Sequence, residues 1–374
     1  MLFHLFFPMA IRVPPGSWKM LDFDTTHEDA WASALGLSKF DLFGPGFARD
    51  VPGKHTVLLD GTSSFLFSVS DDPTLAFDEE INNLAWSSNL RHCVRVIPAL
   101  KELRILRATE SSPMPRRYRS PSDARGLIEV FKLIEADKYS DRQDVVRVAL
   151  TAYRMLRQEL RDKADDVQIL KAFNTILAFR EECEHLDIGP CETLADCLNV
   201  TLGQNLDYLE VPNISNADQI IIGPLLRGLA DGFGSGRSIS THLLLRHASS
   251  ELYQEAHLLL EETPQLKLPG MASGEAENGK LRKDIRFTPS SLARALTRET
   301  FEFVHRGPLD LTESISLFDP ACGSGIFLKE GLRELSRRGS KAKATIKGID
   351  ISPLSVTMSR FVVGRAAKDV DYEV

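Results

Sequence analysis

The feature that most constrains this chain is a strand running into a glycine-rich turn, followed by a helix and a second strand that ends in an acid. Residues 314–335 read SISLFDPACGSGIFLKEGLREL and residues 344–364 read ATIKGIDISPLSVTMSRFVVG. Ile315–Phe318 and Thr345–Ile349 contain β-forming residues, and the residues after each have helical spacing. Because Ile315–Phe318 is nearly all apolar, we expect a strand buried on both faces of a parallel sheet.

The turn and the acid together indicate a class of ligand. Glycines in the turn let the backbone approach a ligand closely, because no Cβ intervenes. Asp350 stands 27 residues after Gly323, which suits a carboxylate that accepts both hydroxyls of a ribose. Ser352 is placed to cap the following helix, with Pro353 at its first position. These features favour a nucleoside-containing ligand over a purely structural α/β unit.

These residues resemble a known family. FDPACGSGIFL resembles the S-adenosylmethionine-binding motif of N6-adenine DNA methyltransferases from restriction–modification and phage-defence systems. It differs from the Gly-x-Gly-x-x-Gly turn of nicotinamide and flavin enzymes. FTP at residues 287–289 resembles the family's additional N-terminal cofactor motif, and GIDISP at 348–353 resembles its ribose-binding motif. The resemblance covers residues 283–374, about a quarter of the chain.

The resemblance implies a Rossmann-like class I methyltransferase domain with S-adenosylmethionine as cofactor and adenine in a specific sequence of double-stranded DNA as methyl acceptor. It implies that Thr288 and Pro289 line the methionine end of the cofactor, with Phe287 supporting them. It implies that Asp350 binds the ribose and that Ile351 lies against the adenine. It also implies that the turn around the methionine moiety of the cofactor is formed by Asp319, Ala321, Cys322, Gly323, Ser324 and Gly325. Cys322 is interpreted as a small buried side chain, not a nucleophile.

The family's catalytic motif has no counterpart in this sequence. That motif, Asp/Asn-Pro-Pro-Tyr/Phe, grips the flipped adenine and lies several tens of residues after the ribose acid. The Pro-Pro pair here, Pro14–Pro15, is near the N-terminus. We therefore assign no catalytic residue, expect the motif beyond Val374, and interpret the chain as the N-terminal part of a methyltransferase whose missing C-terminal regions make most DNA contacts.

An alternative is a non-catalytic binding module or split subunit. Such a chain would dock on a partner that supplies the catalytic half. A specificity, nuclease or complementary methyltransferase subunit would be a suitable partner. The same cofactor motifs are compatible with both interpretations.

Changes in composition and hydrophobic pattern divide the chain into four parts, and the fold class expected overall is α/β. Residues 1–118 are expected to be an α+β domain, 119–268 a helical domain, 269–282 a linker and 283–374 the partial methyltransferase domain. Ser111–Ser120, with two prolines and three arginines, is interpreted as an interdomain linker. Ser140 and Gln143 predict a capping box at the start of a helix. Other expected elements are strands at Thr56–Leu59, Phe65–Val69, Cys93–Ile97 and Leu103–Leu106, and helices over Phe77–Leu90 and His242–Leu260.

Composition and smaller motifs narrow the function classes. The formal net charge is −7, so any nucleic-acid-binding surface must be local or lie on another chain. Five cysteines are few and odd in number, which favours a reducing cytoplasm over a disulfide scaffold. The apolar residues 1–10 are too short to span a membrane, and no membrane association is expected. GFGSG at 232–236 is interpreted as a turn between helices.

A zinc site and a nuclease site are each disfavoured because the sequence lacks the residue pattern that such a site needs. Cys183, His185, Cys191 and Cys197 lack the Cys-x-x-Cys spacing of common zinc sites, so no metal is expected. The N-terminal strand–helix–strand–strand pattern loosely resembles nuclease modules fused to large methyltransferases. Those modules need an Asp and a Glu-x-Lys on adjacent strands, and no convincing Glu-x-Lys is found. A degenerate or structural domain is expected there.

Overall fold

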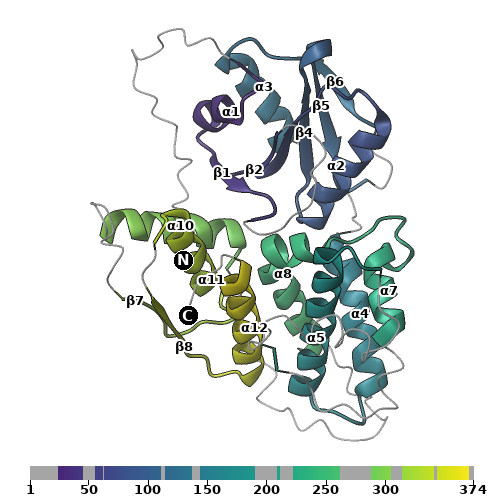
Figure 1. The fold of residues 1–374 in the computed structure, drawn as a ribbon, viewed down its shortest axis with the longest axis vertical. Coiled ribbons are helices and arrows are strands. Elements are labelled where there is room, and N and C mark those ends of the chain that lie inside the picture. The colour runs from purple at the N-terminus through teal and green to yellow at the C-terminus, as the bar shows by residue number, and fades with distance from the viewer. Residues whose placement is uncertain are drawn as a thin grey trace, which may run out of the picture.

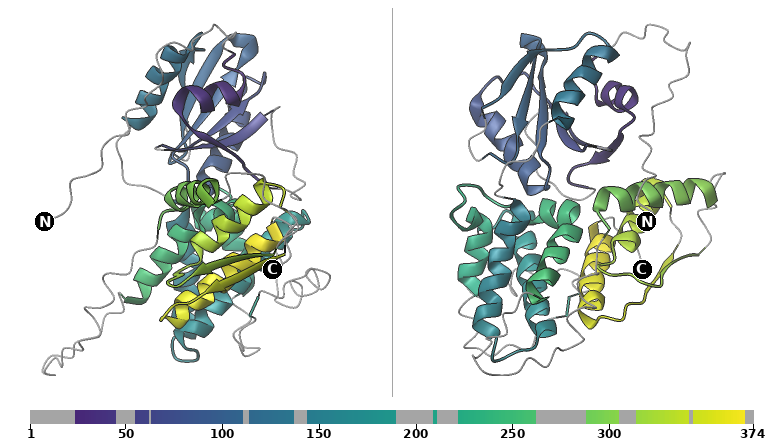
Figure 2. Two further views of the ribbon diagram at one scale, coloured as in Figure 1. Left: turned by 90° about the vertical axis from the view of Figure 1, so that its left-hand side faces the viewer. Right: turned by 180° about the vertical axis from the view of Figure 1, so that it is seen from behind.

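The computed structural model describes residues 24–44, 55–61, 63–110, 114–136, 144–189, 209–210, 222–261, 288–304, 314–340 and 343–369. A six-stranded sheet with its helices lies at one end, above a bundle of helices (Figures 1 and 2). The C-terminal strands and helices lie beside that bundle. The mixed α/β class predicted from the sequence is confirmed.

The large sheet is mixed and follows chain order. Its strands are β1 Ser38–Asp41, β2 His55–Asp60, β3 Phe65–Val69, β4 His92–Ile97, β5 Glu102–Arg107 and β6 Arg116–Arg119. Helix α2, Leu75–Ser87, connects β3 to β4, and this pair is parallel while every other pair is antiparallel. The four predicted N-terminal strands are confirmed as β2 to β5, and the predicted helix as α2.

Because successive side chains of a strand point to opposite faces, the two faces of the sheet contribute side chains to two different cores. Helices α1, Glu28–Leu35, and α3, Ala124–Glu135, cover one face of the sheet. On the other face, Asp78 of α2 accepts hydrogen bonds from Arg95 at 2.5 Å and Arg104 at 2.6 Å, and all three side chains are buried. Helix α3 thus packs on the sheet, although it falls in the sequence range expected to be a separate helical domain.

The linker interpretation of Ser111–Ser120 is wrong for its second half. Arg116–Arg119 form β6, which pairs antiparallel with β5 from Ile105↔Arg116 to Glu102↔Arg119. The local sequence has a weak strand signal because three of its four residues are arginine. Tyr118 packs against the sheet core, and the ladder to β5 satisfies backbone groups, so tertiary pairing decides the conformation.

The bundle contains α4 Val145–Leu160, α5 Asp166–His185, α7 Ile222–Asp231 and α8 Thr241–Glu261. Helix α4 is capped by Asp144, whose Oδ1 accepts the Val146 N–H at 2.9 Å, whereas Ser140 and Gln143 of the predicted capping box lie outside the described residues. The predicted helix over 242–260 is confirmed as α8. A 3-10 turn at Gly232–Gly234 lies between α7 and α8, where the GFGSG turn was expected.

The C-terminal part contains α10 Ser290–Val304, β7 Ile315–Asp319, α11 Ile326–Arg337, β8 Ala344–Gly348 and α12 Pro353–Asp369. Strands β7 and β8 pair in parallel. Helix α12 places Met358, Phe361 and Val362 in the bundle core. The expectation that the first strand is buried on both faces is wrong, because Leu317 packs against α11 while Phe318 is 58% exposed.

Within the ranges given above, no helix is both long and apolar enough to cross a membrane.

Candidate cofactor-binding turn

The turn after β7 is tied to itself and to the end of β8. The Ala321 N–H donates to Asp319 Oδ1 at 3.0 Å, and the Gly325 N–H donates to the Cys322 carbonyl at 2.7 Å. The Cys322 N–H donates to the carbonyl of Ile349, which follows β8, at 2.9 Å. The turn is therefore a closed backbone structure at the carboxyl ends of two parallel strands.

Two glycines shape this turn. Gly323 and Gly325 have φ values of +52° and +80°, a region that L side chains rarely adopt. Gly325 is the N-cap of α11 and supplies no side-chain cap, so the first N–H groups of α11 have no side-chain acceptor from that residue. Ser324 is 1% exposed, and its Oγ has no hydrogen-bond partner among the residues that the structure describes. The start of α11 thus offers donors for an anionic ligand group.

Asp350 lies across the turn from the second strand. Its Oδ2 accepts the Gly323 N–H at 2.9 Å, and its Oδ1 accepts the Ser352 N–H at 2.8 Å. An ionised carboxylate has about four lone-pair positions, so two remain for hydroxyl donors. Ser352 Oγ accepts the Ser355 N–H at 3.4 Å and α12 begins at Pro353, which confirms the predicted cap. Ile351 beside it is fully exposed.

The upstream FTP segment reaches the same region through α8. Phe287 lies outside the described residues, and Pro289 is exposed. The Thr288 carbonyl accepts a hydrogen bond from Ser250 Oγ at 2.8 Å, and Lys329 in the first turn of α11 donates to Ser249 Oγ at 2.8 Å. Neighbouring serines of α8 therefore hold Thr288 and the first turn of α11, and the hydrogen bond of Thr288 is made with α8 and not with the glycine turn.

A cavity of about 580 Å³ opens beside the turn, between β7, β8 and α12. Phe318, Cys322 and Ile349 are among its lining residues, whereas Asp350 is not. Burial raises the pKa of the Cys322 thiol, which a hydrogen bond with Ser359 partly offsets. A protonated, buried thiol suits the space-filling interpretation of Cys322.

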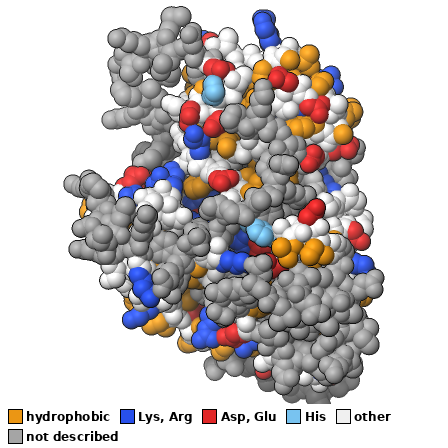
Figure 3. Space-filling model, in the orientation of Figure 1, with side chains coloured by type: hydrophobic (Ala, Val, Ile, Leu, Met, Phe, Trp, Pro, Cys, Tyr) orange, Lys and Arg blue, Asp and Glu red, His pale blue; other side chains and the backbone are white. Residues whose placement is uncertain are grey.

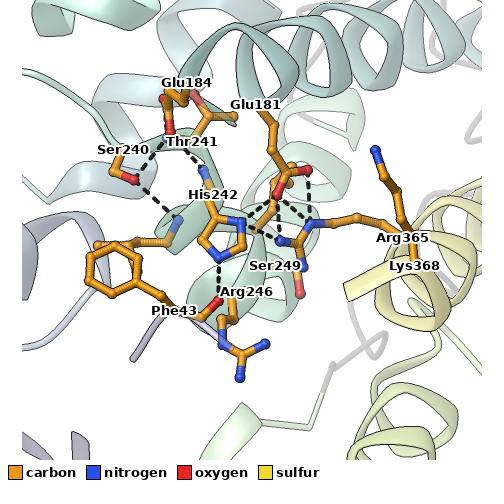
Figure 4. Close-up of polar contacts among 12 residues, drawn as sticks. Phe43, Glu181, Glu184, Ser240, Thr241, His242, Arg246, Ser249, Arg365 and Lys368 are labelled. Atoms are coloured by element: carbon orange, nitrogen blue, oxygen red, sulfur yellow. Dashed lines mark hydrogen bonds and ion pairs between the residues drawn. The ribbon is translucent and has the colours of Figure 1, made fainter. Parts of the chain in front are cut away.

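A buried ionic cluster that sequence reasoning missed holds α12 against the bundle (Figure 4). Glu181 of α5 accepts from Arg365 of α12, with both carboxylate oxygens 3.0 Å from Nε, and lies 2.8 Å from His242 Nδ1 of α8. Burial alone would raise the pKa of Glu181, but Arg365 and His242 lower it to about 2. This cluster fixes the helix that begins immediately after the Asp350 segment.

The same helix α8 also holds the last residue of β1 and the two residues that follow it. Arg246 donates to the Asp41 carbonyl at 3.4 Å, His247 Nε2 lies 2.8 Å from the Leu42 carbonyl, and His242 Nε2 lies 2.7 Å from the Phe43 carbonyl. Desolvation on burial, together with nearby arginines, lowers the pKa of His247, so its neutral ring donates through Nε2. Figure 3 shows basic and acidic side chains together along this boundary between sheet and bundle. Contacts between α8 and three consecutive carbonyls thus hold the sheet against the bundle.

The carboxylate at the end of β2 forms an ion pair with the C-terminal part of the chain. Asp60 at the end of β2 lies 3.1 Å from Arg294 Nε of α10. The adjacent strand β3 reads FLFSV and supplies neither glutamate nor lysine. Among the residues the structure describes, no group of three His, Cys, Asp or Glu could hold a metal; Cys191 and Cys197 lie outside them.

No family model, no curated protein and no solved structure matches this chain.

Proposed function

We propose that residues 283–374 bind S-adenosylmethionine and that the chain contributes the cofactor site of an N6-adenine DNA methyltransferase of a restriction–modification or phage-defence system. The observation that carries the proposal is the contact between Asp350 and the glycine turn. Asp350 and the turn lie in hydrogen-bond contact, as binding of the ribose and of the methionine moiety of one cofactor would require. The adjoining C-terminal strand, turn and helix pattern is consistent with a Rossmann-like domain.

The residues present fit such a cofactor. Asp350 keeps lone pairs for two ribose hydroxyls after accepting its two backbone bonds. The open start of α11 and the Ser324 Oγ, which has no partner within the described part of the chain, suit the carboxylate of the methionine moiety. The exposed Ile351 side chain can cover one face of the adenine. Bound S-adenosylmethionine would supply an electrophilic methyl group, and the task of the chain is to position it.

The methyl acceptor in this proposal is adenine N6 in double-stranded DNA. Transfer needs polar acceptors for the amino hydrogens and an aromatic side chain under the flipped base. No Asp/Asn-Pro-Pro-Tyr/Phe segment is present in this sequence. We therefore assign cofactor binding to these residues and no catalytic residue.

Calorimetry with S-adenosylmethionine tests the proposal on the full chain. We expect one bound cofactor and at least tenfold weaker binding after Asp350→Ala, since hydrogen bonds to a charged group contribute roughly 1.5–3 kcal/mol. The matched control is Asp231→Ala, because Asp231 Oδ1 accepts the Phe233 N–H in the other glycine-rich turn. Equal affinity of wild type and Asp350→Ala would show that the ribose site is misplaced, and no binding by the wild type would refute the proposal.

A second candidate is a binding subunit that works with a separate catalytic partner. The observation in its favour is the apolar surface near the turn, where Phe318 and Ile349 are each 58% exposed. Tritiated S-adenosylmethionine with mixed-sequence DNA separates the two candidates. We expect cofactor binding without label on DNA for these 374 residues; label on adenine would show that the chain is an enzyme by itself.

A further inference from the structure

Strand β6 places three arginines on the open edge of the six-stranded sheet. Arg116, Arg117 and Arg119 are exposed, and β6 is the last strand in the sheet order (Figure 1). Residues 101–125 contain seven lysines and arginines against three acidic residues, in a chain whose net charge is −7. The segment is therefore a local basic region on an anionic protein.

The acidic residues of this segment have partners among the described residues, and Arg117 is the β6 arginine that lies near one of them. Glu102 accepts from Arg104 Nε at 2.6 Å and lies 3.7 Å from Arg117 Nε. Glu110 lies 3.2 Å from Arg107, and Asp123 accepts the Gly126 N–H at the start of α3. Within the part of the chain that the structure describes, Arg116 and Arg119 have no carboxylate partner. Their positive charge is available to an external anion.

The pairing of β6 with β5 fixes the backbone positions from which these arginine side chains extend. Pairing with β5 holds β6 extended, and Tyr118 anchors it by packing on the sheet core. Arg117 and Arg119 therefore share one face of the strand, with their backbone positions about 6.6 Å apart at the usual rise per residue, whereas Arg116 lies on the face of Tyr118. This separation is similar to the step between successive phosphates of one DNA strand. Guanidinium groups bind phosphate through two parallel hydrogen bonds.

The simplest competing explanation for these arginines is that they only keep the edge strand solvated, since charges on an edge strand discourage sheet-to-sheet association. Charges of either sign would serve that purpose. Three arginines on one edge strand, two of which (Arg116 and Arg119) have no carboxylate partner among the described residues, suit a polyanion. We propose that β6 contacts the phosphate backbone of double-stranded DNA and gives the chain sequence-independent affinity. The choice of DNA rests on the proposed function.

The test measures binding of the full chain to a mixed-sequence DNA duplex by fluorescence anisotropy at several salt concentrations. Each phosphate contact adds about 0.9 to the slope of log K against log salt. We expect the variant R116A/R117A/R119A to lower the slope by about 2 to 3 and to weaken binding at least tenfold at low salt. The lysine variant R116K/R117K/R119K keeps the charges, so most of the slope should remain.

The matched control is R147A/R154A/R161A. These arginines are exposed on or next to α4, have no carboxylate partner among the described residues, and carry the same total charge. We expect this control to change the slope little. An equal loss in the two triple variants would mean that total charge decides binding, and it would overturn the proposal. Circular dichroism checks folding; if the β6 triple variant unfolds, R116A and R119A alone should each lower the slope by about one.

Cofactor binding is measured on the same samples, so the two proposals can fail separately. A wild type that binds S-adenosylmethionine but not duplex DNA refutes the β6 proposal alone. DNA binding that depends on β6 in a chain without cofactor affinity supports the β6 contact and refutes the proposed cofactor site. Binding to single-stranded RNA that is tighter than to duplex DNA at equal salt would overturn the choice of DNA.

Discussion

The packing of α11 on α12 predicts different effects for two glycine-to-alanine changes in the C-terminal part. Gly325 has φ +80°, and a Cβ there would lie 2.6 Å from Ser359 Oγ, 3.1 Å from Ser359 Cα and 3.1 Å from Val363 Cγ2. Gly339, after α11, has φ +66°, and no atom of the described residues lies within 4 Å of its Cβ position. The first change adds strain and overlap, whereas the second adds strain alone.

The expected free-energy changes follow from these two geometries. An alanine in the left-handed region costs roughly 1–2 kcal/mol at either position. Overpacking against a fixed neighbour adds typically about 1–3 kcal/mol, and the Ser359 Cα belongs to the backbone of α12 and cannot rotate away. We therefore expect Gly325→Ala to lower the stability of the C-terminal part by about 2–5 kcal/mol and Gly339→Ala by about 1–2 kcal/mol.

Hydrogen exchange read by mass spectrometry over α11 and α12 measures the effect where it arises, since a chain of this size need not unfold in one step. Ser359→Ala in the Gly325→Ala background removes the nearest atom and should recover part of the loss. Equal loss of protection in the two single glycine variants would show that the turn does not pack against α12 as described. That result would also weaken the argument for the cofactor site at this turn.

Three other changes test buried charges. Glu181→Gln leaves Arg365 buried without its carboxylate and should lower the free energy of unfolding at neutral pH by roughly 3–5 kcal/mol, as measured by denaturant titration. Because the pKa of Glu181 is lowered to about 2, the wild-type protein should lose stability as the pH drops from about 4.5 toward 2. The Glu181→Gln variant should lose less stability over the same pH range. Desolvation lowers the pKa of Lys329, so the stability of the wild-type protein should rise as the pH increases toward the ordinary lysine pKa. Lys329→Met should remove this rise, and at neutral pH the variant should be at least as stable as the wild type. Asp78→Ala leaves the buried Arg95 unpaired and should lower the thermal midpoint of the sheet, whereas the exposed Asp72→Ala should change it little.

The sequence determined the local elements of the C-terminal part. The apolar strand residues, the glycine turn and the Ser352–Pro353 start of α12 each act within a few residues, through β propensity, positive φ and helix capping. The same holds for α2 and α8, whose spacing predicts their helices. Asp350 could be named from the sequence because its distance from the turn reflects one βαβ connection.

Tertiary structure alone decided how these elements are joined. Arg116–Arg119 become a strand because β5 offers an edge, and the bond between Thr288 and Ser250 depends on how α8 lies beside the C-terminal part. The cluster of Glu181, His242 and Arg365 joins three helices that are far apart in sequence. Periodicity reports which face of an element is apolar, but it carries no information about which distant element covers that face or which charge meets which carboxylate.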